Sequence, residues 1–357
     1  MLNQQTQQLI VFRCDASNTI GTGHVIRCLT LAHAMKAKGA TCVFVCRDAK
    51  GHLNDYIEAK GFTVHALPED VTIEQDWQQT IEFVKALKQT PFWLVVDHYH
   101  LDVKWEHQLR PYVGHIMVID DMANREHVCD LLLDQNMVPD MAHRYKGLLH
   151  GRVVELLGPK YALLRDEFLE ERAKVTKRTF TPKHVLINFG GGDHKSMCLM
   201  SLRALNYMGY PGKVTLVAGG NNPDLNELEI LCSKRPNTTF LKSTNKMAEL
   251  MREADIAIGA GGSTTWERMC LGLPCVTIAI AENQVEIAEF LGENHYTFYA
   301  GLAKNLTPQK LATYLQQVFF DEKKFRGIEE HSSSHVDGTG AQTIASILLD
   351  KDNEVLK

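Results

Sequence analysis

A glycine turn that leads into a histidine carries the clearest chemical signal in the first part of the chain. The segment Gly21-Thr-Gly23-His24 follows an apolar run, and apolar residues then recur at helical spacing over residues 25–35. His24 is therefore expected in or beside the first turn of a helix. The positive end of the helix dipole disfavours an imidazolium there, so a neutral ring can accept a proton. The pattern predicts a general base; a histidine that only satisfies a local hydrogen bond is the alternative.

The same turn does not fit a dinucleotide-binding fingerprint. Ile26 stands where the third small residue of that motif should fall, after Gly21 and Gly23. The position of the turn after a strand still favours a ligand site, because open parallel sheets bind ligands at the carboxyl ends of their strands.

Two glycine turns in the second half of the chain have the pattern of anion-binding loops. Gly190, Gly191 and a third glycine follow an apolar run, and their amide groups could form an anion-binding concavity. Gly261-Gly-Ser263-Thr264-Thr265 follows another such run. There, hydroxyl and amide groups could cap a helix and donate to a diphosphate. A tight connection between strand and helix is the alternative for each turn.

Acidic and histidine side chains follow other apolar runs. Glu267 could accept hydrogen bonds from a ribose or could compensate a helix dipole. The segment Asp97-His98-Tyr99-His100-Leu-Asp102 invites a metal hypothesis, but neighbours in an extended segment point to opposite faces. We therefore expect no metal. Asp120 and Asp121 could orient a base, bind a hydroxyl or cap a turn.

Composition limits the class of protein. The chain has 357 residues, a net charge of -5 and no run rich in lysine and arginine, which argues against a nucleic-acid surface. Nine scattered cysteines form no CxxC pair and are expected as reduced thiols in the cytoplasm. No apolar run is long enough to span a bilayer. We expect a small-molecule enzyme with no cofactor.

The order of elements predicts two α/β domains. Ten apolar runs are expected as strands, separated by helical patterns. The first set covers residues 9–13, 41–46, 62–67, 92–97 and 115–120, and the alternation restarts with 184–189, 213–218, 238–242, 256–260 and 274–280. This predicts two Rossmann-like, doubly wound parallel-sheet domains, covering residues 1–160 and 182–335, that face each other across a cleft. Residues 336–357 should form a helix near the junction.

Taken together, these motifs resemble the UDP-sugar hydrolases of pseudaminic acid biosynthesis, which release UDP from UDP-2,4-diacetamido-2,4,6-trideoxy-β-L-altropyranose. The segments that carry the resemblance are Arg13 to Leu29, Val96 to Tyr99, Gly158 to Phe168, the turn at Gly190, and Asn283-Gln284. That family in turn resembles GT-B glycosyltransferases, above all the enzyme that adds N-acetylglucosamine to lipid I.

The resemblance implies a GT-B-like fold and a set of roles. It implies that His24 is the catalytic base for a water that attacks the anomeric carbon with inversion. Tyr99 and Asn283, with Gln284, would line the sugar site, and the segment from Ser263 to Pro274 would hold UDP. We further expect Asp15 to orient His24, and Gly21, Gly23 and Arg27 to help bind the substrate.

Two other functions remain open at this point. A GT-B glycosyltransferase would use the same UDP site with a hydroxyl acceptor in place of water. A nucleotide-sugar binding protein without turnover would not depend on His24.

Overall fold

The computed structural model describes residues 7–190, 196–220 and 222–350, and within them the chain divides into two compact units. Unit 1 takes the chain up to Asn136, Asp140–Leu163 and the residues from Thr339 on; unit 2 takes Met137–Pro139 and Leu164–Gly338. Unit 1 is therefore assembled from separate stretches of sequence, and its last stretch is the C-terminal helix.

Unit 1 is built around one seven-stranded sheet. Its strands are β1 (Leu9–Cys14), β2 (Thr41–Arg47), β3 (Thr63–Leu67), β4 (Trp93–Asp97), β5 (His115–Ile119), β6 (Leu131–Asp134) and β7 (Val154–Leu157). They run in the order β3-β2-β1-β4-β5-β6-β7, and every neighbouring pair is parallel. The direction in which strands are added reverses between β1 and β4, which makes that pair the topological switch point of the sheet.

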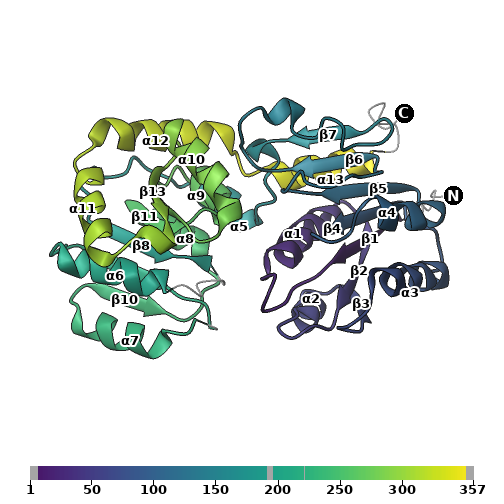
Figure 1. Ribbon diagram of the computed structural model, residues 1–357, viewed down its shortest axis with the longest axis horizontal. Helices are drawn as coiled ribbons and strands as arrows, with labels where there is room; N and C mark the ends of the chain where they lie inside the picture. The colour runs from purple at the N-terminus through teal and green to yellow at the C-terminus, as the bar shows by residue number, and fades with distance from the viewer. Residues whose placement is uncertain (1–6, 191–195, 221, 351–357) are drawn as a thin grey trace. The chain divides into compact units, whose positions relative to one another are not determined.

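Helices cover both faces of this sheet (Figure 1). They are α1 (Gly23–Ala37), α2 (Asn54–Ala59), α3 (Ile73–Ala86), α4 (Val103–Leu109) and α13 (Gly340–Leu349), with short 3-10 turns at Arg110–Tyr112, Met141–His143 and Pro159–Tyr161.

Strand β1 shows why both faces must be covered. Ile10 and Phe12 point into a core shared with α1, α2 and α13, whereas Val11 belongs to a second core shared with α3 and α4. A strand that is apolar on both sides is typical of a parallel sheet buried between two helical layers. Helix α13 packs against α1, and the indole of Trp93 donates to the carbonyl of Leu348 at 2.8 Å.

Unit 2 repeats the scheme with six strands. They are β8 (His184–Asn188), β9 (Lys213–Val217), β10 (Thr238–Leu241), β11 (Ile256–Ala260), β12 (Cys275–Ala279) and β13 (Phe298–Leu302). The order is β10-β9-β8-β11-β12-β13, again with parallel neighbours, so the switch point lies between β8 and β11.

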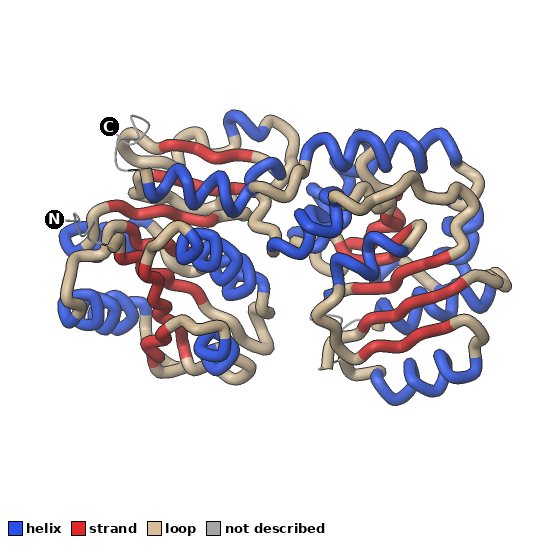
Figure 2. The backbone as a smooth tube through the Cα atoms, turned by 180° about the vertical axis from the view of Figure 1, so that it is seen from behind, coloured by secondary structure: helices blue, strands red, loops and turns tan. Residues whose placement is uncertain are grey.

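The helices of unit 2 lie on both sides of its sheet, as Figure 2 shows for the blue segments around the red strands. They are α5 (Asp166–Arg172), α6 (Met197–Tyr207), α7 (Leu225–Lys234), α8 (Met247–Glu253), α9 (Thr264–Cys270), α10 (Val285–Glu293), α11 (Pro308–Val318) and α12 (Glu322–His335), with 3-10 turns at Glu282–Gln284 and Ala303–Asn305. Val185 and Ile187 of β8 share one core with residues of α6, α7, α11 and α12.

The expected α/β class is confirmed, and the ten strands expected from apolar runs are all present, with ends that differ by a residue or two. Strands β6, β7 and β13 are additions that the sequence pattern did not predict. Among the described residues, no helix is both long and apolar enough to cross a membrane.

Candidate active site

His24 and Asp97 form a buried pair at the switch point of unit 1. Asp97 ends β4 and lies opposite Cys14, the last residue of β1, while His24 is the second residue of α1. The Nδ1 atom of His24 lies 2.6 Å from Oδ1 of Asp97. Among the residues that the structure describes, Nε2 of His24 has no hydrogen-bond partner. With Nδ1–H donating to the carboxylate, Nε2 carries the lone pair and can accept a proton.

Arg27 holds the other side of the Asp97 carboxylate. It lies one turn after His24 on α1, and its Nε and Nη2 atoms donate to Oδ2 and Oδ1 of Asp97 at 2.5 Å and 2.6 Å. Burial alone would raise the pKa of Asp97, but the charge of Arg27 and the hydrogen bonds from Arg27 and His24 lower it instead. Asp97 is therefore a carboxylate anion beside His24.

Tyr99 packs on the imidazole from a position just after β4. The two rings meet edge to face with their centroids 4.5 Å apart. Burial and the nearby carboxylate of Asp121 raise the pKa of the Tyr99 hydroxyl, so it stays protonated. The ring contact restricts the orientation of the His24 imidazole.

Asp15 does not contact His24, contrary to the role expected from its position before the turn. Its carboxylate instead accepts from Arg13 at 2.6 Å and 3.0 Å, from the backbone of Arg47 at 2.7 Å, and pairs with His98 Nε2 at 3.1 Å. The physical reason is the fully buried guanidinium of Arg13, two residues away, which requires a counter-charge. The carboxylate that orients His24 is Asp97.

The glycine turn shapes the approach to α1. Gly21 has a φ of 79°, in the left-handed region that favours glycine, and its backbone pairs with Ser17 in both directions at 2.9 Å and 3.2 Å. Gly23 is the exposed first residue of α1. The turn thus places His24 at the helix start, as the sequence predicted.

The remaining polar residues of this sheet edge are engaged in structural contacts. His98 accepts from the backbone of His100 through Nδ1 at 3.1 Å, and the side chain of Asp102 caps α4. Asp120 pairs with Arg125 and accepts from the hydroxyl of Tyr145 at 3.0 Å, whereas Asp121 accepts from Arg27 at 3.0 Å. Among the described residues, no group of three or more His, Cys, Asp or Glu side chains is arranged to hold a metal ion.

In unit 2, predicted substrate-binding residues follow three neighbouring strands. Gly190 follows β8, Ser263 follows β11, and Gln284 follows β12. Because the strands are parallel neighbours, these loops lie at one edge of the sheet, at its switch point. The carboxamide of Gln284 accepts from the backbone of Ile280 at 3.0 Å and approaches Gly262. Gly191 and the side chain of Asn283 lie outside the described residues.

The hydroxyl groups of this segment are arranged differently from the expected cap. Ser263 precedes α9 and is exposed, but its side chain makes no capping hydrogen bond. The hydroxyls of Thr264 and Thr265 accept from Arg268 at 3.1 Å each, since that buried guanidinium one turn later needs acceptors. Ser263 is the most exposed of these three hydroxyl residues.

Glu267 is held by Arg165, a partner that the sequence did not reveal. Nη2 of Arg165 donates to Oε1 of Glu267 at 3.2 Å and also pairs with Glu167 at 3.0 Å. Burial raises the pKa of Glu267, and the positive charges of Arg165 and Arg268 oppose that rise.

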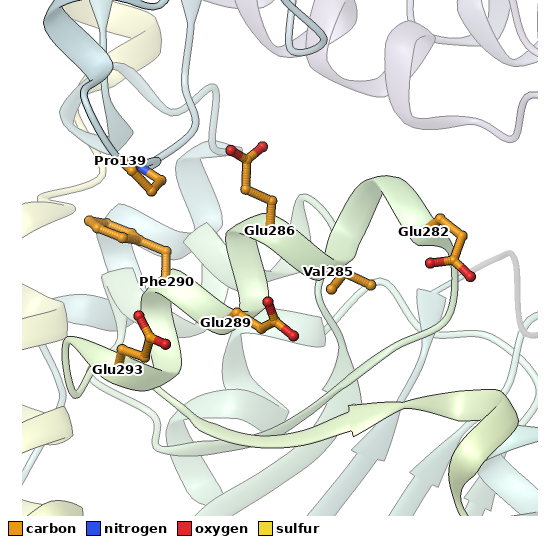
Figure 3. Close-up of a pocket in the computed structure, with 7 residues that line it drawn as sticks. All are labelled: Pro139, Glu282, Val285, Glu286, Glu289, Phe290 and Glu293. Carbon is orange, nitrogen blue, oxygen red and sulfur yellow. The ribbon is translucent and has the colours of Figure 1, made fainter.

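A surface pocket of about 460 Å³ in unit 2 lies along α10 (Figure 3). Phe290 points toward Pro139 there, and the other lining residues are Glu282, Val285, Glu286, Glu289 and Glu293. Four carboxylates would repel a diphosphate, so this pocket does not fit the expected UDP ligand.

Comparison with known proteins identifies the fold. Residues 199–346 match the model of the glycosyltransferase family 28 C-terminal domain. The crystal structure of MurG from Acinetobacter baumannii is similar over 96% of this chain and 99% of that chain, with a TM-score of 0.65 and 14% identity. The fold of this protein is GT-B.

Sequence relatives confirm the resemblance to the hydrolases. The chain is 26% identical over 288 residues to the UDP-2,4-diacetamido-2,4,6-trideoxy-beta-L-altropyranose hydrolase of Campylobacter jejuni, covering 80% of this chain and 97% of that protein. It is also 22% identical over 341 residues to the spore coat polysaccharide biosynthesis protein SpsG of Bacillus subtilis, covering 94% and 96% of the two chains.

Proposed function

We propose that this protein is a UDP-sugar hydrolase, with UDP-2,4-diacetamido-2,4,6-trideoxy-β-L-altropyranose as its substrate. The observation that carries the proposal is the 2.6 Å contact between His24 Nδ1 and Asp97, which leaves Nε2 without a partner among the described residues. A carboxylate–histidine pair of this kind is a general base. The similarity to the hydrolase of Campylobacter jejuni supports the choice of substrate.

In this proposal, Nε2 of His24 takes a proton from a water molecule as its oxygen attacks the anomeric carbon. The bond between that carbon and the UDP oxygen breaks, and its electron pair leaves with UDP. The free sugar has the opposite anomeric configuration. Asp97 stabilises the imidazolium formed during the step, and general-base help of this kind is worth about 10²–10⁴-fold.

Unit 2 would hold the UDP leaving group. The match to the family 28 C-terminal domain and the loops after β8, β11 and β12 support this assignment. Backbone amides at Gly190 and near Ser263 would bind the diphosphate, and Glu267 would accept hydrogen bonds from the ribose. Tyr99 and Asn283 would contact the sugar.

The test follows UDP release from the proposed substrate in ¹⁸O-labelled water with excess EDTA. We expect activity to survive the chelator and UDP to stay unlabelled, because water attacks carbon. His24→Ala should abolish turnover, whereas His107→Ala, an exposed histidine of the same unit, should not. Label in UDP would mean attack at phosphorus and would contradict the mechanism.

A glycosyltransferase is the second candidate, supported by the family 28 match and the GT-B fold. It predicts that UDP appears only after an alcohol or lipid-linked acceptor is added. If UDP is released in water alone as fast as in the presence of an acceptor, the glycosyltransferase is excluded.

A further inference from the structure

All three guanidinium nitrogens of Arg27 donate to carboxylates of the protein. Nε and Nη2 grip Asp97, Nη1 donates to Asp121 at 3.0 Å, and Nη2 also lies 3.3 Å from Nδ1 of His24. The residue is 8% exposed. Each of its nitrogens therefore has a carboxylate partner. The sequence motif instead predicts that Arg27 helps to bind the substrate.

This arrangement opposes a two-point contact between Arg27 and a ligand. A phosphate that paired with Nε and Nη2 would have to displace a buried two-point contact between a guanidinium and a carboxylate, which is among the strongest hydrogen-bonding arrangements in proteins. Displacement would also leave the fully buried Asp97 without its cation, at a large cost in free energy.

The charges around His24 assign Arg27 a different role. The groups that face the imidazole are Asp97 and Tyr99 on the β4 side, Arg27 on α1, and His98 behind them. An isolated carboxylate against Nδ1 would stabilise the imidazolium, which cannot act as a base. The positive charge of Arg27, whose Nη2 lies 3.3 Å from Nδ1, opposes that effect.

We infer that Arg27 is a positioning residue: it fixes the Asp97 carboxylate against His24, balances its charge so that the imidazole stays able to accept a proton, and does not bind substrate. The kinetic test of this inference rests on the proposed function, whereas the NMR test of the His24 imidazole does not.

The first test is the pH dependence of kcat/KM in Arg27→Gln. Removal of the positive charge should move the acid limb of the kcat/KM profile to a pH about one unit higher. The reason is that one charge within a few ångströms shifts the pKa of a neighbouring group by about one to three pH units. Activity should therefore be lost mainly below neutral pH, while the Kd for UDP stays within about twofold of wild type, a shift of less than 0.5 kcal/mol.

Arg27→Lys separates charge from geometry. A lysine keeps the positive charge but lacks the planar fork that contacts both oxygens of Asp97. We expect its acid limb to stay near that of wild type while kcat falls. Arg110→Gln is the matched control, because Arg110 forms a two-point pair with Asp130 in the same unit, where Asp130 binds the backbone at the start of β5.

NMR titration of the His24 imidazole, assigned with His24→Gln, gives the independent readout. Arg27→Gln should raise the pH at which the signal titrates, even if wild type releases no UDP and the proposed function fails. A weakened Kd for UDP with an unmoved acid limb, or an unmoved imidazole titration, would overturn the inference.

Discussion

The imidazole of His24 and the carboxylate of Asp97 are in contact at 2.6 Å although 73 residues separate them in the sequence. The contact exists because β1 and β4 are parallel neighbours, so the loop that begins α1 and the end of β4 reach the same sheet edge. Strand order, rather than any local motif, brings the two groups together.

Asp97→Asn should lower kcat by about 10²–10⁴-fold, because an amide cannot fix the tautomer that leaves Nε2 free of its proton. The double variant with His24→Ala should lose little more than either single variant, since the two residues act as one unit. Steady-state kinetics of the three variants measures this. Multiplicative losses would show that the residues act independently.

Asp15→Asn should affect stability more than catalysis. It would leave the buried Arg13 with one carboxylate partner, Asp76, in place of two. Loss of one partner of a buried ion pair costs about 3–5 kcal/mol, so the urea midpoint should fall markedly. If the folded Asp15→Asn variant instead loses as much kcat as Asp97→Asn, then Asp15 does help His24 to act as the base.

Stability should respond to pH through Asp134. Burial raises the pKa of its carboxyl group to about 6, above an unfolded value near 4. The unfolded chain therefore loses this proton first, and the group costs stability as pH rises from 4 to 6. Relative to Asp134→Asn, wild type should lose about 2–3 kcal/mol of unfolding free energy between pH 4 and pH 7.

Asp130 provides the comparison with the opposite sign. Burial alone would raise the pKa of its carboxyl group, but hydrogen bonds from Arg110 and from the backbone of Ile116 lower it. Its contribution is present at neutral pH and is lost as pH falls below 4. Urea unfolding of Asp130→Asn against wild type should therefore show a difference that shrinks toward acid pH; the same slope as for Asp134 would contradict both assignments.

Two glycines near the predicted UDP loop should respond differently to alanine. A Cβ at Gly259 would lie 2.6 Å from the backbone oxygen of Asn188, so Gly259→Ala should force β8 and β11 apart and lower the melting temperature. Among the residues that the structure describes, a Cβ at Gly262 would meet only Gln284, at 4.0 Å. Gly262→Ala should fold normally and weaken UDP binding, which calorimetry measures; unchanged affinity would move the UDP site away from this loop.

Much of the fold follows from the sequence because apolar runs and helical spacing are local. The capping box that starts α3, in which Thr72 and Gln75 bond to each other's backbone at 3.2 Å and 2.9 Å, is one such local signal. Strands β6 and β7 were not predicted because no α-helix separates β5, β6 and β7 in this described part of the chain, so the alternation of strands and helices does not mark them. In β13, Gly301 at a φ of 106° lies where the pairing register with β12 shifts.

The site was predictable only in part. The place of His24 at a helix start came from local spacing, which the structure confirms. The partner of His24 could not be predicted in this way. Asp15 is nearer to His24 in the sequence, and only the strand order brings Asp97 beside His24. The same holds for Arg165 and Glu267, which are 102 residues apart. Such pairings depend on tertiary geometry, which composition and spacing do not contain.

The return of α13 to unit 1 has a consequence for biosynthesis. Residues 164–338 of unit 2 form one continuous stretch, whereas the core of unit 1 includes Ile344 and Leu348 from the far end of the chain. During synthesis on the ribosome, the strands of the sheet that carries His24 are made before unit 2. The packing around Trp93 in that sheet is complete only after α13, which follows unit 2 in the sequence, has been made. The unit that is synthesised first is thus the one completed last.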